Sequence, residues 1–180
     1  MDETIILVDT KNHPIGTALK RDVHTGNTPL HRGFSLFLFN NKKEVMLQQR
    51  SKKKKTWPEM WSNSVCGHPL PHESLPNAAK RRLVDELSLR AHDIQVIIPN
   101  YQYRFEKDGV VENEICPILI GITTHKPILN YDEVAAVTWM PWEKWLQEIE
   151  IHPQKYSPWS IEESSLLQAS KKFQQFFQTL

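Results

Sequence analysis

Short apolar runs separated by turn residues recur along the chain and predict a protein rich in β-strands. Runs of about four to eight β-branched and aromatic residues are typical of strands, and Gly, Pro, Asn and Asp mark their ends. The turn residues Asn40 to Lys43 and the Asp108-Gly109 pair indicate two hairpins. The expected strand-bearing runs are TIILVD (4–9), FSLFLFN (34–40), EVMLQQR (44–50), IQVIIPNYQYRF (94–105), VVENEICPILIGIT (110–123) and VAAVTWM (134–140).

Helical spacing is found in three further segments. Apolar residues recur at helical intervals behind Ser74 and predict a helix to about Leu89. A short helix is expected over PWEKWLQEI (141–149). The last helix is expected to run from about 157 to 180. Its apolar stripe consists of Phe173, Phe176, Phe177 and Leu180, and the acids Glu162 and Glu163 are expected in its first turn.

Two segments lack a regular pattern and are expected to be loops. Residues 17–33 are polar and broken by glycine and proline, and they carry His24 and His31. Residues 51–74 combine a four-lysine run with tryptophans and prolines. A connection of that length is usually functional. No linker divides the chain, so we expect a single domain over residues 1–180, with a core at about 30–150.

Composition and charge exclude several classes of protein. The 180 residues are 39% hydrophobic, which is enough for a core, and 22 Lys and Arg against 21 Asp and Glu give a net charge of +1. This balance argues against a general nucleic-acid or anionic-membrane binder. The charges are nevertheless uneven, since residues 1–90 hold 15 basic and 9 acidic groups and residues 91–180 hold 7 and 12. With no apolar run of about 18 residues and no signal-peptide pattern, a cytoplasmic location is expected.

The strand that includes Glu112, Glu114 and Cys116 should project these three side chains from one face, because strand residues alternate. Neighbouring carboxylates face solvent, share a proton or hold a cation. An exposed strand end beside the Asp-Gly turn is the simplest interpretation of this pair.

Histidines supply the second interpretation. His24, His31 and His68 lie on irregular segments that are able to converge on one face of a sheet. Three imidazoles and two carboxylates would form a mixed nitrogen and oxygen site suited to Mn²⁺, Mg²⁺ or Zn²⁺. A histidine on a loop is more often an ordinary surface residue, so spacing alone leaves both interpretations open.

The two cysteines, Cys66 and Cys116, are expected to be free thiols, and Cys116 fits a packed position. Cys66 is either a small buried apolar residue or a reactive thiol whose pKa is lowered by His68, by Arg81 or Arg82 and by a metal. Nearby cations are either a solvated surface or a clamp for a phosphate or diphosphate. They comprise Lys20, Arg21, Arg50, Lys52 to Lys55, Arg81 and Arg82.

The segment GHPLPHESLPNAAKRRLVDELSL, starting at Gly67, resembles a degenerate Nudix box, the loop-helix-loop motif of diphosphate-handling enzymes. Arg82 stands where the box has its first helical Glu, Asp85 replaces another Glu, and Ser88 replaces the late Gly, whereas Glu86 is retained. The other motifs resemble one branch of that superfamily, the type I isopentenyl diphosphate isomerases. They are HTGNTPLHRGFS, QQRSKKKKTWP, WSNSVCGHP, YRF, VENEICP and YSPW.

This resemblance implies an α+β fold, an α-β-α sandwich with a Nudix-like mixed sheet flanked by helices, an N-terminal extension and a C-terminal helix. It implies that one divalent metal, Mn²⁺, Mg²⁺ or Zn²⁺, binds to a three-histidine, two-glutamate site, and that a second ion, Mg²⁺, is bound with the substrate diphosphate. The implied metal ligands are His24, His31, His68, Glu112 and Glu114 for the first ion, and Glu86 and the carbonyl of Cys66 for the second. The implied diphosphate contacts are Lys20, Arg50, Lys54 and Arg82.

In the same resemblance Cys66 and Glu114 are the catalytic pair, Tyr103 assists Glu114, and Trp159 faces a carbocation. Moving the double bond of isopentenyl diphosphate needs one acid and one base on opposite faces of the alkene. A small-molecule substrate and a monomer are expected, with a dimer left open, and with no nucleic-acid or membrane partner. A Nudix pyrophosphohydrolase is the alternative, and a metal- or phosphoinositide-binding module without turnover is a second one.

Overall fold

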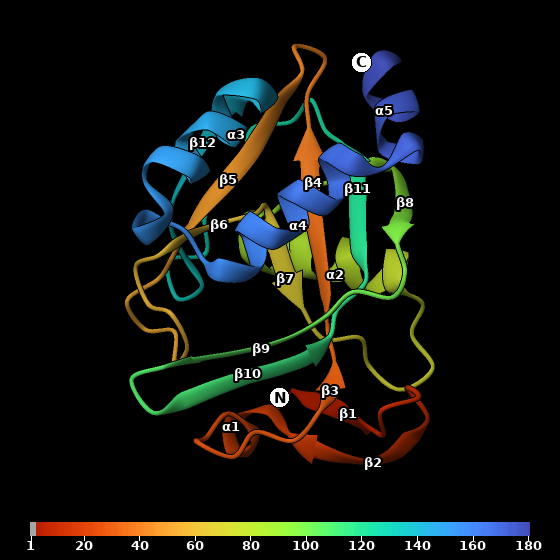
Figure 1. Ribbon diagram of the computed structural model, residues 1–180, viewed down its shortest axis with the longest axis vertical. Helices are drawn as coiled ribbons and strands as arrows, with labels where there is room; N and C mark the ends of the chain where they lie inside the picture. Colours follow the sequence, from red (N-terminus) through yellow and green to blue (C-terminus); the bar gives the residue numbers. More distant parts are fainter. Residues whose placement is uncertain (1–2) are drawn as a thin grey trace.

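Two sheets meet end to end in the computed structural model, which describes residues 3–180 (Figure 1). The smaller sheet has the order β2-β1-β3-β10-β9, and the larger has the order β12-β5-β4-β11-β8 with β6 and β7 attached. The strands of the smaller sheet are β1 (Thr4–Val8), β2 (Pro14–Leu19), β3 (His31–Arg32), β9 (Gln102–Lys107) and β10 (Val110–Ile115). Those of the larger sheet are β4 (Phe34–Phe39), β5 (Glu44–Arg50), β6 (Trp61–Ser62), β7 (Val65–Gly67), β8 (His92–Ile98), β11 (Ile118–Ile122) and β12 (Val134–Pro141).

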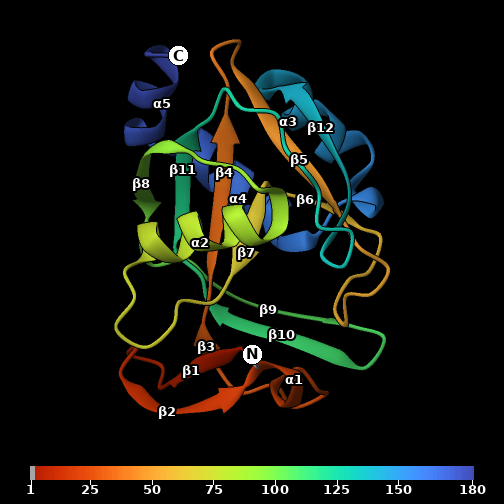
Figure 2. The ribbon, with the colours of Figure 1, turned by 180° about the vertical axis from the view of Figure 1, so that it is seen from behind.

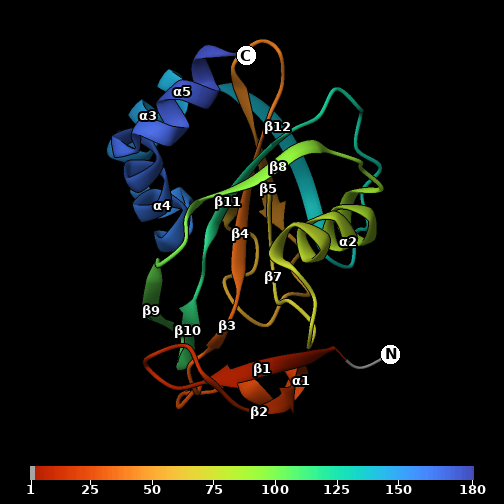
Figure 3. The ribbon, with the colours of Figure 1, turned by 90° about the vertical axis from the view of Figure 1, so that its right-hand side faces the viewer.

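Helices cover both faces of the larger sheet, which makes a three-layer arrangement (Figure 3). On one side lies α2, and on the other lie α3, α4 and α5 (Figures 2 and 3). The helical elements are α1 (Lys20–Val23), α2 (Leu75–Leu87), α3 (Trp142–Ile151), the 3₁₀ turn η1 (Pro153–Lys155), α4 (Pro158–Ala169) and α5 (Lys171–Gln178). This is the expected α+β architecture of a mixed sheet flanked by helices.

The central strand β4 shows why the sequence pattern there is continuously apolar. Leu36 and Leu38 pack towards α2, while Phe37 and Phe39 pack towards the helices on the other side. A strand that is buried on both faces needs apolar residues at nearly every position. Ser35 is the polar exception on this strand, and it lies on the face that α4 covers.

Prolines explain how each of two long apolar runs contributes one strand to the smaller sheet and one to the larger sheet. The run 110–123 is split at Pro117 into β10 of the smaller sheet and β11 of the larger sheet. The run 94–105 is split in the same way near Pro99. Proline has no backbone N–H for a strand ladder and so favours such a boundary.

Three expectations about elements were wrong. Residues 17–33 contain the end of β2, α1 and β3, so His31 lies on a strand. The last helix is two helices, because Ser170 has an extended backbone (φ −82°, ψ 119°) and its hydroxyl accepts a hydrogen bond from Phe173 N as the N-cap of α5. Residues 51–74 were expected to be a loop and instead contain β6 and β7. The expected hairpin after β4 is confirmed, but β4 and β5 pair only at Phe39 and Val45, because β7 pairs with β4 and β6 with β5 along the rest of the facing edges.

Within residues 3–180, no helix is both long and apolar enough to cross a membrane.

Candidate metal and proton-transfer site

Histidines and carboxylates from four separate segments meet where the two sheets join. Ligand atoms of His24, His31, His68 and Glu114 all lie within 4.8 Å of one another. Glu112 belongs to the same group, since its Oε2 is 3.1 Å from His24 Nε2. All five side chains are buried.

Backbone pairing and backbone carbonyls fix the orientation of these ligands. The parallel pairing of β3 with β10 places Glu114 directly beside His31. His31 Nδ1 is 2.9 Å from the carbonyl of Pro29, and His24 Nδ1 is 3.4 Å from the carbonyl of Lys20. A ring whose Nδ1–H is held by a carbonyl directs Nε2 towards the centre as a lone-pair donor, which is the usual support of a histidine metal ligand.

Glu114 lies at the centre of the group. Its Oε1 is 3.1 Å from His68 Nε2 and 3.3 Å from His31 Nε2. Burial raises the pKa of Glu114, but the hydrogen bonds and charges of His31 and His68 outweigh burial and hold this pKa well below its ordinary value. Glu114 is therefore a carboxylate, the form that binds a cation.

Unsatisfied buried atoms show that the group fits a metal ion. His31 Nε2 and Glu112 Oε2 are buried and lie close to Glu114 and His24, but neither atom makes a hydrogen bond of good geometry with the described residues. The three imidazole centroids lie only 5.2 to 5.7 Å apart. Buried polar groups are normally paired, so a cation among these donors would remove a large cost. A mixed set of imidazole and carboxylate donors suits Mn²⁺, Mg²⁺ or Zn²⁺.

A cavity of about 440 Å³ opens beside this group. Its walls include most of the side chains that the sequence singled out: Lys20, His24, Arg50, Lys54, Cys66, His68, Tyr103, Glu112, Glu114 and Trp159. His31, Arg82 and Glu86 do not line it. His31 is fully buried behind the cavity, whereas Arg82 and Glu86 lie on α2.

Aromatic rings form one wall of the cavity. Tyr103 stacks on Trp159 with centroids 5.9 Å apart and an interplanar angle of 15°, and Trp57 meets Trp159 edge-on at 5.2 Å. Tyr103 Oη donates to Glu114 Oε2 at 3.1 Å. Burial and the charge of Glu114 raise the pKa of Tyr103 well above its ordinary value, so the phenol keeps its proton.

Cys66 lies in β7, and its sulfur is held by neighbours on two sides. Sγ donates to Asn63 Oδ1 at 3.1 Å and lies 3.4 Å from Ser35 Oγ. Burial raises the pKa of the Cys66 thiol to about 12. Among the groups expected to lower this pKa, Arg81 is bonded to Glu73 and Arg82 to Glu86, which leaves His68 and a bound metal.

The four cations expected to contact a diphosphate are each engaged by an oxygen partner. Lys20 pairs with Glu3 at 2.6 Å, and Arg50 donates to the carbonyl and hydroxyl of Thr56. Lys54 pairs with Glu133, and Arg82 lies 3.4 Å from the same carboxylate besides its bond to Glu86. The basic groups thus lie close together, joined by acids that a diphosphate would have to replace or share.

Sequence reasoning missed Glu3 and Glu133, the acids that pair with these cations. Glu133 follows Asp132 in a loop with no motif, and only its acidic character marks it. Glu163 was also misassigned, because we expected it among the acids of the first helical turn, and it is instead fully buried against Ser35 of β4. Burial of this kind has no signal in a single sequence.

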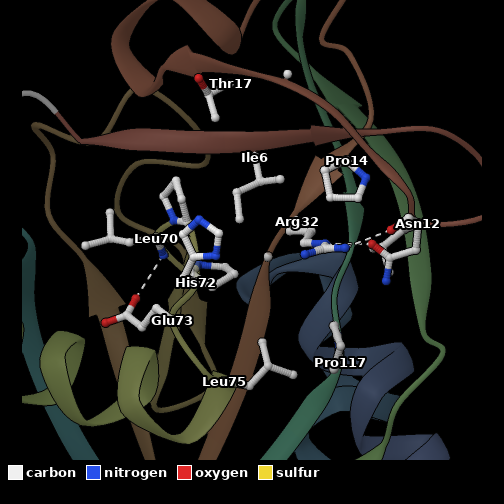
Figure 4. Close-up of a pocket in the computed structure, with 15 residues that line it drawn as sticks. Ile6, Asn12, Pro14, Thr17, Arg32, Leu70, His72, Glu73, Leu75 and Pro117 are labelled. Carbon is white, nitrogen blue, oxygen red and sulfur yellow. Dashed lines mark hydrogen bonds between the residues drawn. The ribbon is translucent and has the colours of Figure 1, made fainter.

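A second cavity, of about 620 Å³, lies on the reverse side of the smaller sheet (Figure 4). It is lined mainly by apolar side chains and prolines, including Ile6, Leu70 and Pro117. In Figure 4 its most prominent polar groups are already paired, since Arg32 bonds Asn12 and Glu73 accepts from Leu70 N. The concentration of ionisable groups makes the 440 Å³ cavity the candidate site.

Comparisons with known proteins find relatives that match most of the chain. The NUDIX domain family matches residues 29–160. A protein of Kocuria rhizophila named isopentenyl-diphosphate Delta-isomerase is 42% identical over 158 residues, which cover 87% of this chain and 88% of that protein. A protein of the same name from Corynebacterium glutamicum (strain ATCC 13032) is 41% identical, and the match covers 91% of this chain and 89% of that protein. Another from Salmonella typhi is 36% identical, and the match covers 98% of both chains.

Solved structures show the same fold at low identity. A Deinococcus radiodurans protein superposes with a TM-score of 0.71 at 18% identity, covering 91% of this chain and 98% of that one. The MutT protein of Methanosarcina mazei superposes with a TM-score of 0.61 at 20% identity, covering 82% and 95%.

Proposed function

The chain belongs to the NUDIX domain family and, within it, to the isopentenyl-diphosphate Delta-isomerases, and we propose that Cys66 and Glu114 carry out its proton transfers. The enzyme isomerises isopentenyl diphosphate to dimethylallyl diphosphate. The observation that supports this pair most is that one small cavity is lined by a thiol, a carboxylate bonded to a phenol, and a tryptophan face.

The reaction adds a proton to the terminal alkene carbon and removes one from the adjacent methylene, through a tertiary cation. Because Glu114 is a carboxylate at rest, it first takes up a proton from solvent and then delivers it to the alkene, directly or by way of Tyr103 Oη, which lies 3.1 Å from Glu114 Oε2. The Cys66 thiolate takes the second proton and becomes the thiol, and the two roles reverse in the back reaction. The Trp159 ring stabilises the positive charge between the two steps, as a π face does for a cation.

Divalent metals belong to this proposal in two places. His24, His31, His68, Glu112 and Glu114 would hold Mn²⁺, Mg²⁺ or Zn²⁺, and Glu86 with the Cys66 carbonyl would hold Mg²⁺ with the diphosphate. When bound, these ions supply positive charge that holds the diphosphate and favours the thiolate. Lys20, Arg50, Lys54 and Arg82 neutralise the rest of the diphosphate charge and fix the short carbon tail in the cavity. A monomer in the cytoplasm completes the proposal.

A Nudix pyrophosphohydrolase would share the fold and the Mg²⁺. Arg82 is the feature that disfavours hydrolysis, because it occupies the place of a carboxylate of the Nudix box and bonds Glu86, the acid that the box retains. A metal- or phosphoinositide-binding module without turnover would make Cys66 dispensable.

The test is to incubate the purified protein with isopentenyl diphosphate and Mg²⁺ or Mn²⁺ in deuterated water. We expect dimethylallyl diphosphate that has gained deuterium, with no release of phosphate. Phosphate release would favour the hydrolase, and absence of the isomer with both metals would contradict the proposal.

The assignment of Cys66 has its own test. Cys66→Ala should lower kcat by at least about 10³-fold, because removing an acid-base group costs typically 10² to 10⁴. Circular dichroism and metal content should stay unchanged. Cys116→Ala is the matched control. The sulfur atoms of Cys66 and Cys116 lie at similar distances from Ser35 Oγ, 3.4 and 3.5 Å, but Cys116 does not line the cavity. Full activity of Cys66→Ala would show that the base is wrongly assigned.

A further inference from the structure

Glu163 of α4 is a carboxyl group in the core of the protein with no role in the reaction described above. It is 0% exposed, and no cation among residues 3–180 forms an ion pair with it. Its Oε1 is 2.6 Å from Ser35 Oγ, while its Oε2 is buried without a hydrogen-bond partner among the described residues. A charge in such a place is very costly, so the group has to be neutral or compensated.

The protonated, neutral form of the Glu163 carboxyl fits the hydrogen-bonding groups around it. Burial, with the charges of Glu114 and Glu162 adding to it, raises the pKa of Glu163 well above its ordinary value. A protonated carboxyl is a hydrogen-bond donor, whereas a carboxylate only accepts. With Glu163 protonated, the 2.6 Å contact can be made by the hydrogen of Glu163, which leaves the hydrogen of Ser35 free for another acceptor.

The other neighbours of Ser35 Oγ are sulfur atoms. Cys66 Sγ is 3.4 Å away and Cys116 Sγ is 3.5 Å away. Ser35 and Cys66 are also direct partners across the antiparallel pairing of β4 and β7, so the backbone keeps this contact in place.

On the side away from Ser35, the Cys66 sulfur is held by a second hydrogen-bond partner. Cys66 Sγ donates to Asn63 Oδ1 at 3.1 Å. Asn63 is buried, and its Nδ2 donates to the carbonyls of Leu36 at 3.2 Å and Val65 at 3.1 Å. With Glu163 protonated, the four side chains can form one directed series of hydrogen bonds, from Glu163 to Ser35, from Ser35 to Cys66 rather than to Cys116, and from Cys66 to Asn63. Members of such a series strengthen one another.

We propose that Glu163 is a positioning residue for the isomerase: acting through Ser35, it orients the Cys66 thiol for proton transfer in the cavity. Glu163 touches neither the cavity nor the proposed substrate position. The inference rests on the proposed role of Cys66. An ionised Glu163 would take the only hydrogen of Ser35 and leave Cys66 without its donor.

Two replacements of Glu163 separate this role from simple core packing. Glu163→Gln keeps an N–H donor towards Ser35, and Glu163→Leu fills a similar volume without one. We expect kcat of the Leu variant to fall about tenfold at unchanged KM, because Ser35 loses the donor that fixes its hydroxyl and its hydrogen can then turn from Cys66 to Cys116 Sγ, 3.5 Å away. Glu163→Gln should stay within about twofold of the unchanged enzyme.

Ser35→Ala should reproduce the loss, and combining it with Glu163→Leu should add no further loss, because both remove the same series. A Gln variant as impaired as the Leu variant would overturn the proposal, because a neutral donor would then not suffice. Unchanged kcat in Glu163→Leu, or a loss carried by KM, would also overturn it.

An infrared measurement keeps this test separate from that of the proposed function. The S–H stretching band of Cys66, identified by its disappearance in Cys66→Ala, reports the hydrogen bonds at the sulfur without any substrate. It should shift in Glu163→Leu and Ser35→Ala and stay in place in Glu163→Gln. A band that is the same in all variants contradicts the positioning role, whether or not the protein isomerises isopentenyl diphosphate.

Discussion

At the scale of single residues, the group of histidines and carboxylates proposed to bind a metal depends on the absence of one side chain. A Cβ atom added to Gly33 would lie 1.9 Å from Glu114 Oε2 and 2.6 Å from Glu114 Cδ. Gly33 directly follows the β3 strand that pairs with Glu114. The glycine between β3 and β4 thus provides the room in which the central carboxylate lies.

Gly33→Ala should displace Glu114 from His31 and His68. We expect loss of bound metal, a fall in kcat of at least about 10²-fold, and a loss of about 1 to 3 kcal/mol in the free energy of unfolding, as is usual for overpacking. Elemental analysis, activity and urea denaturation measure the three effects. Gly16→Ala is the control, because a Cβ there meets nothing within 4 Å. Wild-type metal content in Gly33→Ala would contradict this account.

The kinds of residue in the site could be predicted from the sequence, but their partners could not. The ENE triplet and the three histidines stand out as ligand types, and alternation in a strand places Glu112 and Glu114 on one face. The high pKa of the Cys66 thiol without a metal could not be predicted, because it depends on burial and on where Arg81 and Arg82 point. Those facts arise from contacts between distant segments, as does the burial of Glu163.

At the scale of elements, α2 shows how a departure from the family motif is accommodated. Ser88 replaces the late glycine of the Nudix box, and it takes the left-handed conformation that ends α2, with φ 49° and ψ 31°. Its N–H bonds the carbonyls of Leu83 and Val84, so the cap is complete. The helix thus ends where the motif predicts, with a residue that is strained there.

Ser88→Gly should relieve that strain. We expect the free energy of unfolding to rise by about 1 kcal/mol, because glycine adopts positive φ without a steric cost. Ser165→Gly, at an exposed position inside α4, should instead lower it by about 0.5 kcal/mol, because glycine is a poorer helix former than serine. Urea denaturation of both variants gives the comparison, and a decrease in Ser88→Gly would show that the left-handed cap carries no strain.

Strand and helix positions were mostly predictable, whereas strand partners were not. Apolar runs located the strands of the larger sheet, because burial on both faces leaves a strong pattern. The same pattern gives no information on which sheet a run joins, so the division of 110–123 between β10 and β11 was not expected. The break between α4 and α5 at Ser170 was not predicted either, because the N-cap of α5 depends on a local backbone turn within an otherwise helical pattern.

At the scale of the whole molecule, the uneven charge of the two halves has a structural counterpart. Lys20 and Lys54 from the basic half lie on the same cavity as Glu112 and Glu114 from the acidic half. Lys54 and Arg82 also pair with Glu133 across the two halves. The near-zero net charge is therefore the sum of two opposed regions that meet at the site.

Removing the metal should destabilise the whole protein. A ligand at about a thousand times its Kd stabilises by about 4 kcal/mol, so a chelator should lower Tm by roughly 8 to 16 °C in a protein of this size. Differential scanning calorimetry with and without chelator measures the shift. Glu112→Gln should show a much smaller shift, and His125→Ala, at an exposed histidine away from the site, should show the full one. An unchanged Tm in the chelated protein would contradict metal binding at the histidine group.

The parallel pairing of β3 with β10 also sets the order in which the protein can assemble. His24, His31 and His68 are synthesised early, but Glu112 and Glu114 come from a strand much later in the chain. Contacts between residues so far apart in sequence form slowly, because the intervening chain has to be closed first. A nascent chain therefore carries three imidazoles without their carboxylates, and the complete ion site is a late event of folding. A divalent cation would then stabilise the protein after it has folded rather than nucleate its folding.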